Sequence, residues 1–209
     1  MPGLHFLSQQ PEKIAANVEQ LVRKELGAPT PIPYQILPGT STGASAGSLL
    51  GEWAKAQIRM TQQAEALCYV TFNMGWPRPF ELQISLIQRG LGTLVGKCVF
   101  AVPMAKRVPG PVLLEKLTLG GPRGFSGEPG LSKHLNNNRQ VLAGLYRLSV
   151  DSSTIGNTKL TIARHVEIRP TPQGSVLIIN RLPTELLLMA NMGIKDILAF
   201  MPTLEAYLL

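Results

Sequence analysis

The chain has 209 residues, a net charge of +7, 44% hydrophobic residues and a mean hydropathy of +0.12. This length suits one domain, and the hydrophobic content is ample for its core. No uncharged apolar run approaches the roughly 18 residues that a membrane-spanning helix needs, which argues against a transmembrane protein. The apolar content is nevertheless slightly rich for a chain whose whole surface meets water, and such a surplus often covers a partner or a membrane.

The N-terminal sequence and the cysteines indicate the compartment. The first residues, MPGLHFLSQQPEK, lack a basic start and a long apolar segment, so we expect no signal peptide. Cys68 and Cys98 lie in apolar runs without metal-type spacing, and we expect buried free thiols. Free thiols fit a reducing compartment. The prediction is a cytoplasmic protein without metal or cofactor, with peripheral attachment to a membrane as the alternative.

Residues 1–33 predict an N-terminal helical arm and a proline-rich connector. Ser8 is placed to cap a helix that runs to about Leu26, and Gly27 is placed to end it. The apolar residues at helical spacing are Ile14, Val18, Leu21, Val22 and Leu26. Residues 34–209 are expected to form a single α+β domain.

A segment of small residues follows, between a predicted short strand at Tyr34–Leu37 and a predicted helix at Leu49–Leu67. It contains the pattern G-x-S-x-G twice, centred on Ser41 and Ser45. A strand–turn–helix context is that of a nucleophile elbow. The first copy resembles the serine motif of patatin-like lipases, and this resemblance implies a serine hydrolase.

The remaining features of a hydrolase are incomplete in the sequence. Ser45, Asp151 and His165 follow each other in the chain order of a catalytic triad. The patatin-like family would also need a glycine-rich oxyanion loop upstream and an Asp-Gly pair downstream, and neither occurs here. Because the segment after Pro38 consists only of Gly, Ser, Thr and Ala, we favour a flexible linker.

The strands of the domain are predicted in adjacent pairs. Alternating apolar residues predict strands at Cys68–Met74, Phe80–Gln88, Thr93–Val102, Lys159–Arg169 and Ser175–Leu182. Arg164 breaks the alternation of the fourth of these strands. Since the strands do not alternate with helices, we predict an α+β fold with a mainly antiparallel sheet built from hairpins. Helices flank this sheet at the N- and C-terminal ends.

The middle of the chain predicts a strand at Leu113–Leu119, a glycine-rich loop at Gly120–Gly130 and a helix at Leu131–Arg147. A glycine loop that feeds a helix N-terminus has the topology of a phosphate cradle, but no P-loop or dinucleotide motif is present. A surface loop is therefore preferred, with anion binding as the alternative. We expect Ser132 to cap the helix and His134 to lie at the surface. Asn136, Asn137 and Asn138 are poor helix formers and predict either a solvated polar face, which we prefer, or a hydrogen-bonding surface.

The positive charge is concentrated in this part of the chain. Between Lys97 and Arg147 there are eight basic and two acidic residues, whereas residues 151–209 contain five of each. A localised positive field attracts nucleic acid, acidic lipid or an acidic protein face. The candidate residues for binding an anionic partner are Lys106, Arg107, Lys116, Arg123, Lys133 and Arg139.

The C-terminal part predicts apolar helices. A helix is expected at about Thr184–Met192, then one or two turns at Ile194–Met201 that Pro202 ends. Because termini usually fray in water, an apolar terminus suggests docking, either onto the protein's own core or onto a partner or membrane. The candidate docking residues are Ile197, Phe200, Met201, Tyr207 and Leu209.

These features favour a non-enzymatic binding or assembly protein, an accessory factor for a protein complex or an anionic membrane surface. Its basic middle block would contact the anionic surface, and its apolar C-terminal helices would contact a protein partner or a membrane face. One alternative is an RNA- or DNA-binding protein in which Phe125 or Trp76 stacks on bases. The others are a serine hydrolase and a carrier of a lipid or small hydrophobic ligand.

Overall fold

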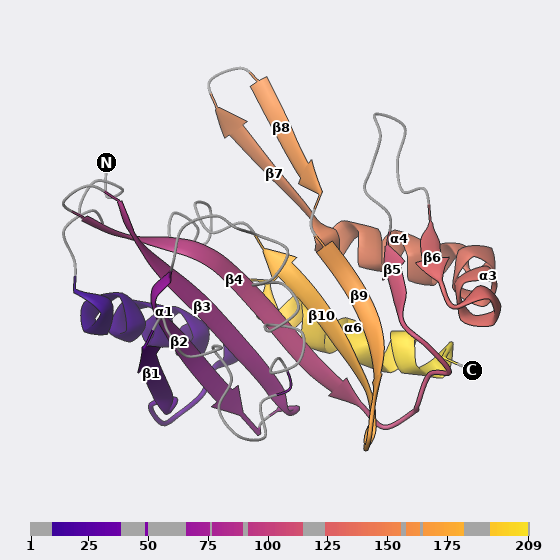
Figure 1. Ribbon diagram of the computed structural model, residues 1–209, viewed down its shortest axis with the longest axis horizontal. Helices are drawn as coiled ribbons and strands as arrows, with labels where there is room; N and C mark the ends of the chain where they lie inside the picture. Colours follow the sequence, from indigo (N-terminus) through magenta and orange to yellow (C-terminus); the bar gives the residue numbers. More distant parts are fainter. Residues whose placement is uncertain are drawn as a thin grey trace. The chain divides into compact units, whose positions relative to one another are not determined.

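A computed structural model of the chain describes residues 10–38, 49, 66–75, 77–89, 92–114, 124–155, 158–163, 165–181 and 193–208 (Figure 1). Eight strands form an antiparallel sheet in the order β1-β2-β3-β4-β10-β9-β5-β6, and β7 and β8 form a separate two-stranded ladder. With helices toward both ends of the described chain, this is the α+β fold that the hairpin pattern predicts.

The contacts within the chain divide it into two compact units. Unit 1 comprises Met1–Ala101 and Leu182–Ile194, and unit 2 comprises Val102–Arg181 and Lys195–Leu209. The predicted domain start at residue 34 falls inside unit 1, where helix α1 contacts strand β1. Each unit is described by itself below.

Unit 1 combines one helix with strands that pair in chain order. Its elements are α1 (Pro11–Leu26), β1 (Tyr34–Pro38), β2 (Ala66–Met74), β3 (Phe80–Arg89) and β4 (Gly92–Met104), the last of which continues into unit 2. Because successive strand residues face opposite sides, alternate positions supply the apolar core together with one face of α1. Core residues include Ile14, Val18, Val22, Val70, Phe72, Leu82, Ile84, Leu86 and Phe100.

The pairing of β3 with β4 confirms the predicted hairpin, and the left-handed conformation of Gly27 (φ 65°) confirms the predicted end of α1. The predicted cap of that helix is wrong. The N-cap is Gln10, because Pro11 has no N–H to satisfy and is favoured in the first helical position. The predicted end of the next helix at Leu67 is wrong, since β2 begins at Ala66. Residues 50–65, which hold the rest of that predicted helix, lie outside the described residues.

Unit 2 contains the other half of the sheet and three helices. Its strands are β5 (Val112–Leu114), β6 (Phe125–Gly127), β7 (Val150–Ile155), β8 (Thr158–Ala163), β9 (His165–Thr171) and β10 (Gly174–Arg181). Its helices are α3 (Pro129–Asn137), α4 (Arg139–Ser149) and α6 (Ile194–Ala206). The predicted hairpin between β9 and β10 is confirmed by their antiparallel register.

The long strand predicted at Lys159–Arg169 is two strands. Strand β8 pairs only with β7 in the separate ladder, whereas β9 pairs with β10 and β5 in the large sheet. Residue 164 lies between them, outside the described residues. The alternation would have placed an arginine on the core side at this position, and burying an unpaired charge is costly. This cost gives a physical reason for one sequence run to divide between two sheets.

The glycine-rich loop predicted at Gly120–Gly130 is more regular than expected. Strand β6 begins at Phe125 and pairs with β5, and α3 begins at Pro129. The carboxylate of Glu128, not the hydroxyl of Ser132, caps α3 by accepting a hydrogen bond from the N–H of Leu131 at 2.5 Å. Residues 115–123 lie outside the described residues, and they include most of the strand predicted up to Leu119.

The single helix predicted at Leu131–Arg147 is two helices, and its asparagines explain why. Asn138 has an extended backbone, and its side chain accepts a hydrogen bond from the N–H of Val141 at 3.0 Å, as an N-cap of α4 does. The amide of Asn136 accepts from Phe125 N at 2.6 Å and donates to Phe125 O at 2.9 Å. Asn136 and Asn137 are exposed, as the predicted solvated face requires. Asn136 and Asn138 also bond backbone groups, which is the alternative role of a hydrogen-bonding surface.

The helix expected to end before Pro202 continues through it, and α6 runs to Ala206. A proline inside a helix removes one hydrogen bond and usually costs about 3 kcal/mol. Here Pro202 lies on the exposed side, while the opposite side of α6 is buried. The buried residues of α6 are Ile194, Ile197, Leu198, Met201 and Leu204. We infer that this apolar burial offsets the lost bond.

Gly124 allows a test of the link between β6 and α3. Its φ is 109°, and an added Cβ would lie 2.5 Å from Asn136 Oδ1. We expect Gly124→Ala to lower the free energy of unfolding by about 1–3 kcal/mol, measured by urea denaturation. Gly130→Ala is the control, because a Cβ there would make only ordinary contacts with Glu128. Equal stabilities of the two variants would contradict this account of the link.

Cys68 and Cys98 are both buried free thiols, as predicted. Burial, followed by the negative charge of Glu12, raises the pKa of the Cys68 thiol. Since the thiolate is the reactive form, we expect a thiol reagent at pH 8 to modify Cys68 and Cys98 far more slowly in the native protein than in 6 M guanidinium. Time-resolved absorbance with a chromogenic disulfide reagent measures both rates. Rapid labelling of Cys68 without unfolding would contradict the burial.

Candidate anion-binding surface

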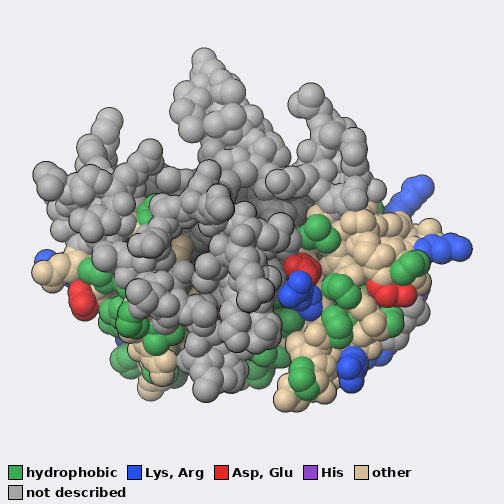
Figure 2. All heavy atoms as spheres, viewed as in Figure 1, with side chains coloured by type: hydrophobic (Ala, Val, Ile, Leu, Met, Phe, Trp, Pro, Cys, Tyr) green, Lys and Arg blue, Asp and Glu red, His purple; other side chains and the backbone are tan. Residues whose placement is uncertain are grey.

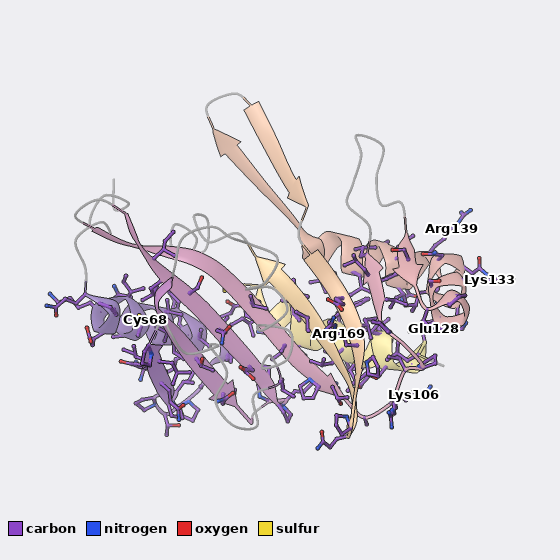
Figure 3. The ribbon with its side chains drawn as sticks, viewed as in Figure 1. Cys68, Lys106, Glu128, Lys133, Arg139 and Arg169 are labelled. Carbon is purple, nitrogen blue, oxygen red and sulfur yellow. The ribbon has the colours of Figure 1, made fainter. Side chains whose placement is uncertain are left out.

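Four of the predicted cationic residues lie on the surface of unit 2. Lys106 and Arg107 are exposed on the loop after β4, Lys133 is exposed on α3, and Arg139 is exposed at the start of α4. We call these four residues the basic surface. Figure 3 shows the side chains of Lys133 and Arg139 pointing away from the helices. Figure 2, viewed from the same direction, shows blue Lys and Arg side chains at the right of the view. The other two candidates, Lys116 and Arg123, lie outside the described residues.

Three charges of the basic surface have no partner among the described residues. In the described ranges, Arg107, Lys133 and Arg139 make neither a hydrogen bond nor an ion pair through their side chains. Other arginines behave differently: Arg23 lies 3.4 Å from the carboxylate of Glu19, and Arg169 pairs with Glu167. Unpaired, exposed cations keep their full field available to a partner.

Lys106 is the best-fixed member of the basic surface. The hydroxyl of Ser175, a residue with 1% exposure, donates to Lys106 O at 2.7 Å and accepts from Val108 N at 2.8 Å. At the neighbouring Gly174 an added Cβ would collide with the carbonyl oxygens of Met104 and Ala105. The first two residues of β10 thus hold the main chain around Lys106 in place.

The two described residues just after the last turn of α6 contact both Lys106 and helix α3. Lys106 Nζ donates a hydrogen bond to Leu208 O, and His134 Nε2 lies 2.8 Å from Tyr207 O. Two successive carbonyls therefore contact side chains from distant parts of the sequence. His134, predicted to be a simple surface residue, is half-buried and makes this contact, and its neighbour Lys133 belongs to the basic surface.

The N-terminus of α3 is not the anion site that a phosphate cradle would supply. The carboxylate of Glu128 occupies the position where an anion would accept from the Leu131 N–H. Glu128 N also donates to Pro111 O at 3.0 Å, which ties the cap to the segment before β5. The candidate anion-binding groups in the described part of this region are therefore side chains and not the helix end.

Two of the predicted docking residues of α6 are buried within the chain itself. Ile197 and Met201 are 1% and 0% exposed, and Phe200 is half-buried against Gly144 of α4. Tyr207 is half-buried, while Leu209 lies outside the described residues. Leu208, which was not among the predicted residues, is 2% exposed. Docking onto a partner stays a prediction, and among these described residues only Phe200 and Tyr207 have exposed area to offer.

The serine hydrolase alternative stays a prediction, because the residues that would carry it are not described together. Ser41 and Ser45 lie outside the described residues, Asp151 lies in β7 and His165 begins β9. The base-stacking role proposed for Phe125 is not supported, because this residue is 5% exposed and Asn136 bonds its backbone. Trp76 lies outside the described residues.

Unit 1 contains a buried polar row that the sequence pattern does not reveal. Thr71, Glu81 and Gln83 lie on the side of β2 and β3 opposite the apolar core, and all three are buried. Glu81 Oε2 accepts from Leu49 N at 2.7 Å, whereas Thr71 Oγ1 has no hydrogen-bond partner within the described part of the chain. Polar residues that alternate with apolar ones normally predict a solvated strand face. The sequence pattern therefore gave no sign that these three residues are buried.

Comparison with protein-family models, curated proteins and solved structures finds no match to this chain. No helix among the described residues is long and apolar enough to cross a membrane. The same residues contain no group of three or more His, Cys, Asp or Glu arranged to hold a metal ion. The candidate surface therefore has to be interpreted from its own geometry.

The cap of α3 gives a direct test of the geometry beside the basic surface. We expect Glu128→Ala to lower the free energy of unfolding by about 0.5–2 kcal/mol, because the Leu131 N–H loses its acceptor. Glu128→Gln keeps an acceptor oxygen and should lose less. Thermal and urea unfolding of both variants measure the difference. A larger loss for the glutamine variant would show that Glu128 does not act as a hydrogen-bonding cap.

Proposed function

We propose that this protein is a non-enzymatic binding protein that attaches to an acidic face of a partner protein through the basic surface. The observation that supports this proposal is the excess of unengaged cations over unengaged carboxylates among the described residues of unit 2. Glu128 and Glu167 are engaged by a helix N-terminus and by Arg169, and the exposed Asp196 on α6 is the carboxylate without such a contact in this part of the chain. The cations Arg107, Lys133 and Arg139 are exposed and have no internal role within the described residues.

The physical consequence is an attractive field for anions around these exposed cations. Exposed cations without internal partners raise the local positive potential and speed encounter with an acidic surface. The effect is screened by salt, with a Debye length of about 8 Å at physiological ionic strength. Each contact with an acidic group is then worth roughly 0.2–1 kcal/mol, so several cations must act together.

The surroundings of the cations favour a protein partner over a membrane or single-stranded nucleic acid. Among the described residues, the exposed large hydrophobic side chains are Tyr34 and Leu113, and neither belongs to the basic surface. Stable membrane attachment usually needs an apolar anchor in addition to basic charge. Binding of single strands usually uses exposed aromatic stacking platforms. Asn137 and Gln140, which are exposed beside Arg139, supply neutral hydrogen-bonding groups instead.

A pair of matched variants tests this function. The probe is poly-glutamate, with phosphatidylserine vesicles and 20-nucleotide single- and double-stranded DNA in parallel. We expect Lys133→Gln with Arg139→Gln to weaken poly-glutamate binding by about 2- to 30-fold, since each charge contributes roughly 0.2–1 kcal/mol. Fluorescence anisotropy at 50 and 300 mM NaCl measures the affinities.

The control is Lys13→Gln with Lys24→Gln, which removes two exposed lysines from α1 and changes the net charge equally. Equal weakening by both pairs would show that only net charge matters and would remove the assigned surface. Absence of poly-glutamate binding would contradict the function. Tighter binding to vesicles or DNA than to poly-glutamate would replace the acidic protein by that partner class.

A further inference from the structure

Lys106 belongs to the basic surface and also contacts the residues that follow α6. Its ammonium group donates to Leu208 O, and the residue is nevertheless exposed. An ammonium group has three N–H donors, and this contact uses one of them. The remaining donors can contact an anion while the bond to Leu208 O persists.

The main chain of Lys106 is fixed independently of the C-terminal end. Ser175 bonds both Lys106 O and Val108 N from a buried position, and the absence of a side chain at Gly174 lets the same loop approach. These contacts fix the main chain of Lys106 but not its side chain. The hydrogen bond to Leu208 O fixes the position of the side chain as well. Ordering a free lysine side chain costs rotamer entropy, which a ligand would otherwise have to offset on binding.

The C-terminal end is anchored where it meets Lys106. Leu204 and Leu208 are buried, and His134 Nε2 contacts Tyr207 O at 2.8 Å. Tyr207 N donates to Leu204 O at 3.0 Å, so the last turn is closed. A helix C-terminus carries partial negative charge, which a nearby ammonium group stabilises. The hydrogen bond between Lys106 and Leu208 O therefore orders the lysine side chain and also stabilises the docked residues 204–208.

We propose that binding of an acidic ligand at the basic surface and docking of residues 204–208 are positively coupled through Lys106. This inference rests on the proposed function. A docked end holds the Lys106 side chain in advance, so an acidic ligand binds a site that is already ordered. By linkage, the bound ligand must stabilise the docked end by the same factor. The half-exposed Tyr207 then becomes a reporter of ligand occupancy.

Amide hydrogen exchange tests the coupling. The probe is poly-glutamate, and NMR follows exchange of the Tyr207 and Leu208 amides in the full chain. In the wild type we expect saturating poly-glutamate to slow this exchange by about 5-fold or more, the lower end of typical couplings. In Lys106→Met the slowing should disappear, although the other three cations still bind the ligand. In Lys133→Gln binding weakens, but the slowing at saturation remains.

The reverse direction uses Leu208→Ala, which removes an apolar anchor and no charge. We expect it to weaken poly-glutamate binding in the wild-type background and to have no effect in the Lys106→Met background. Circular dichroism verifies that each variant is folded. If Leu208→Ala does not fold, amide exchange in Lys133→Gln with saturating poly-glutamate still tests the coupling. Binding without slower exchange of Tyr207 and Leu208 would overturn the coupling and leave the proposed function intact. No binding to the wild type would overturn the function itself.

Discussion

The buried hydroxyl of Ser175 is the interaction on which the arrangement of the basic surface depends. It donates to Lys106 O and accepts from Val108 N, so one oxygen satisfies two backbone groups of the loop after β4. Without this hydroxyl those groups would lose their partner, at a cost of about 1–3 kcal/mol for each one that stays buried. The loop in turn presents Lys106 to the end of α6, and that end contacts α3 through His134. One serine on β10 therefore organises contacts among three segments that are far apart in sequence.

Much of the sheet could be predicted from the sequence, because a strand with one buried face has a local period of two. The pairs β3–β4 and β9–β10 follow from such alternation and from the turns between them. The errors occur where a side chain makes a nonlocal or unusual contact. Asn138 caps α4 and so divides a predicted helix, and Pro202 is tolerated because the opposite side of α6 is buried. Local periodicity contains neither piece of information.

The candidate surface, like the sheet, could be predicted only in part. Exposure of Lys106, Arg107, Lys133 and Arg139 could be predicted, since charged residues without partners rarely enter a core. The contacts that fix Lys106 could not be predicted, because Ser175 and Leu208 lie 69 and 102 residues away along the chain. The buried row of Thr71, Glu81 and Gln83 was missed for a related reason. Alternation identifies the apolar face of a strand but does not tell whether the other face meets water or protein.

Gly144 has a consequence for how copies of this protein behave in concentrated solution. An added Cβ at this position would overlap the ring of Phe200, which is already half-exposed. Any side chain at residue 144 would have to displace that ring. A ring displaced toward solvent would add exposed aromatic area, which promotes self-association. The absence of a side chain at residue 144 therefore lets Phe200 pack against α4 and limits the aromatic area on the surface.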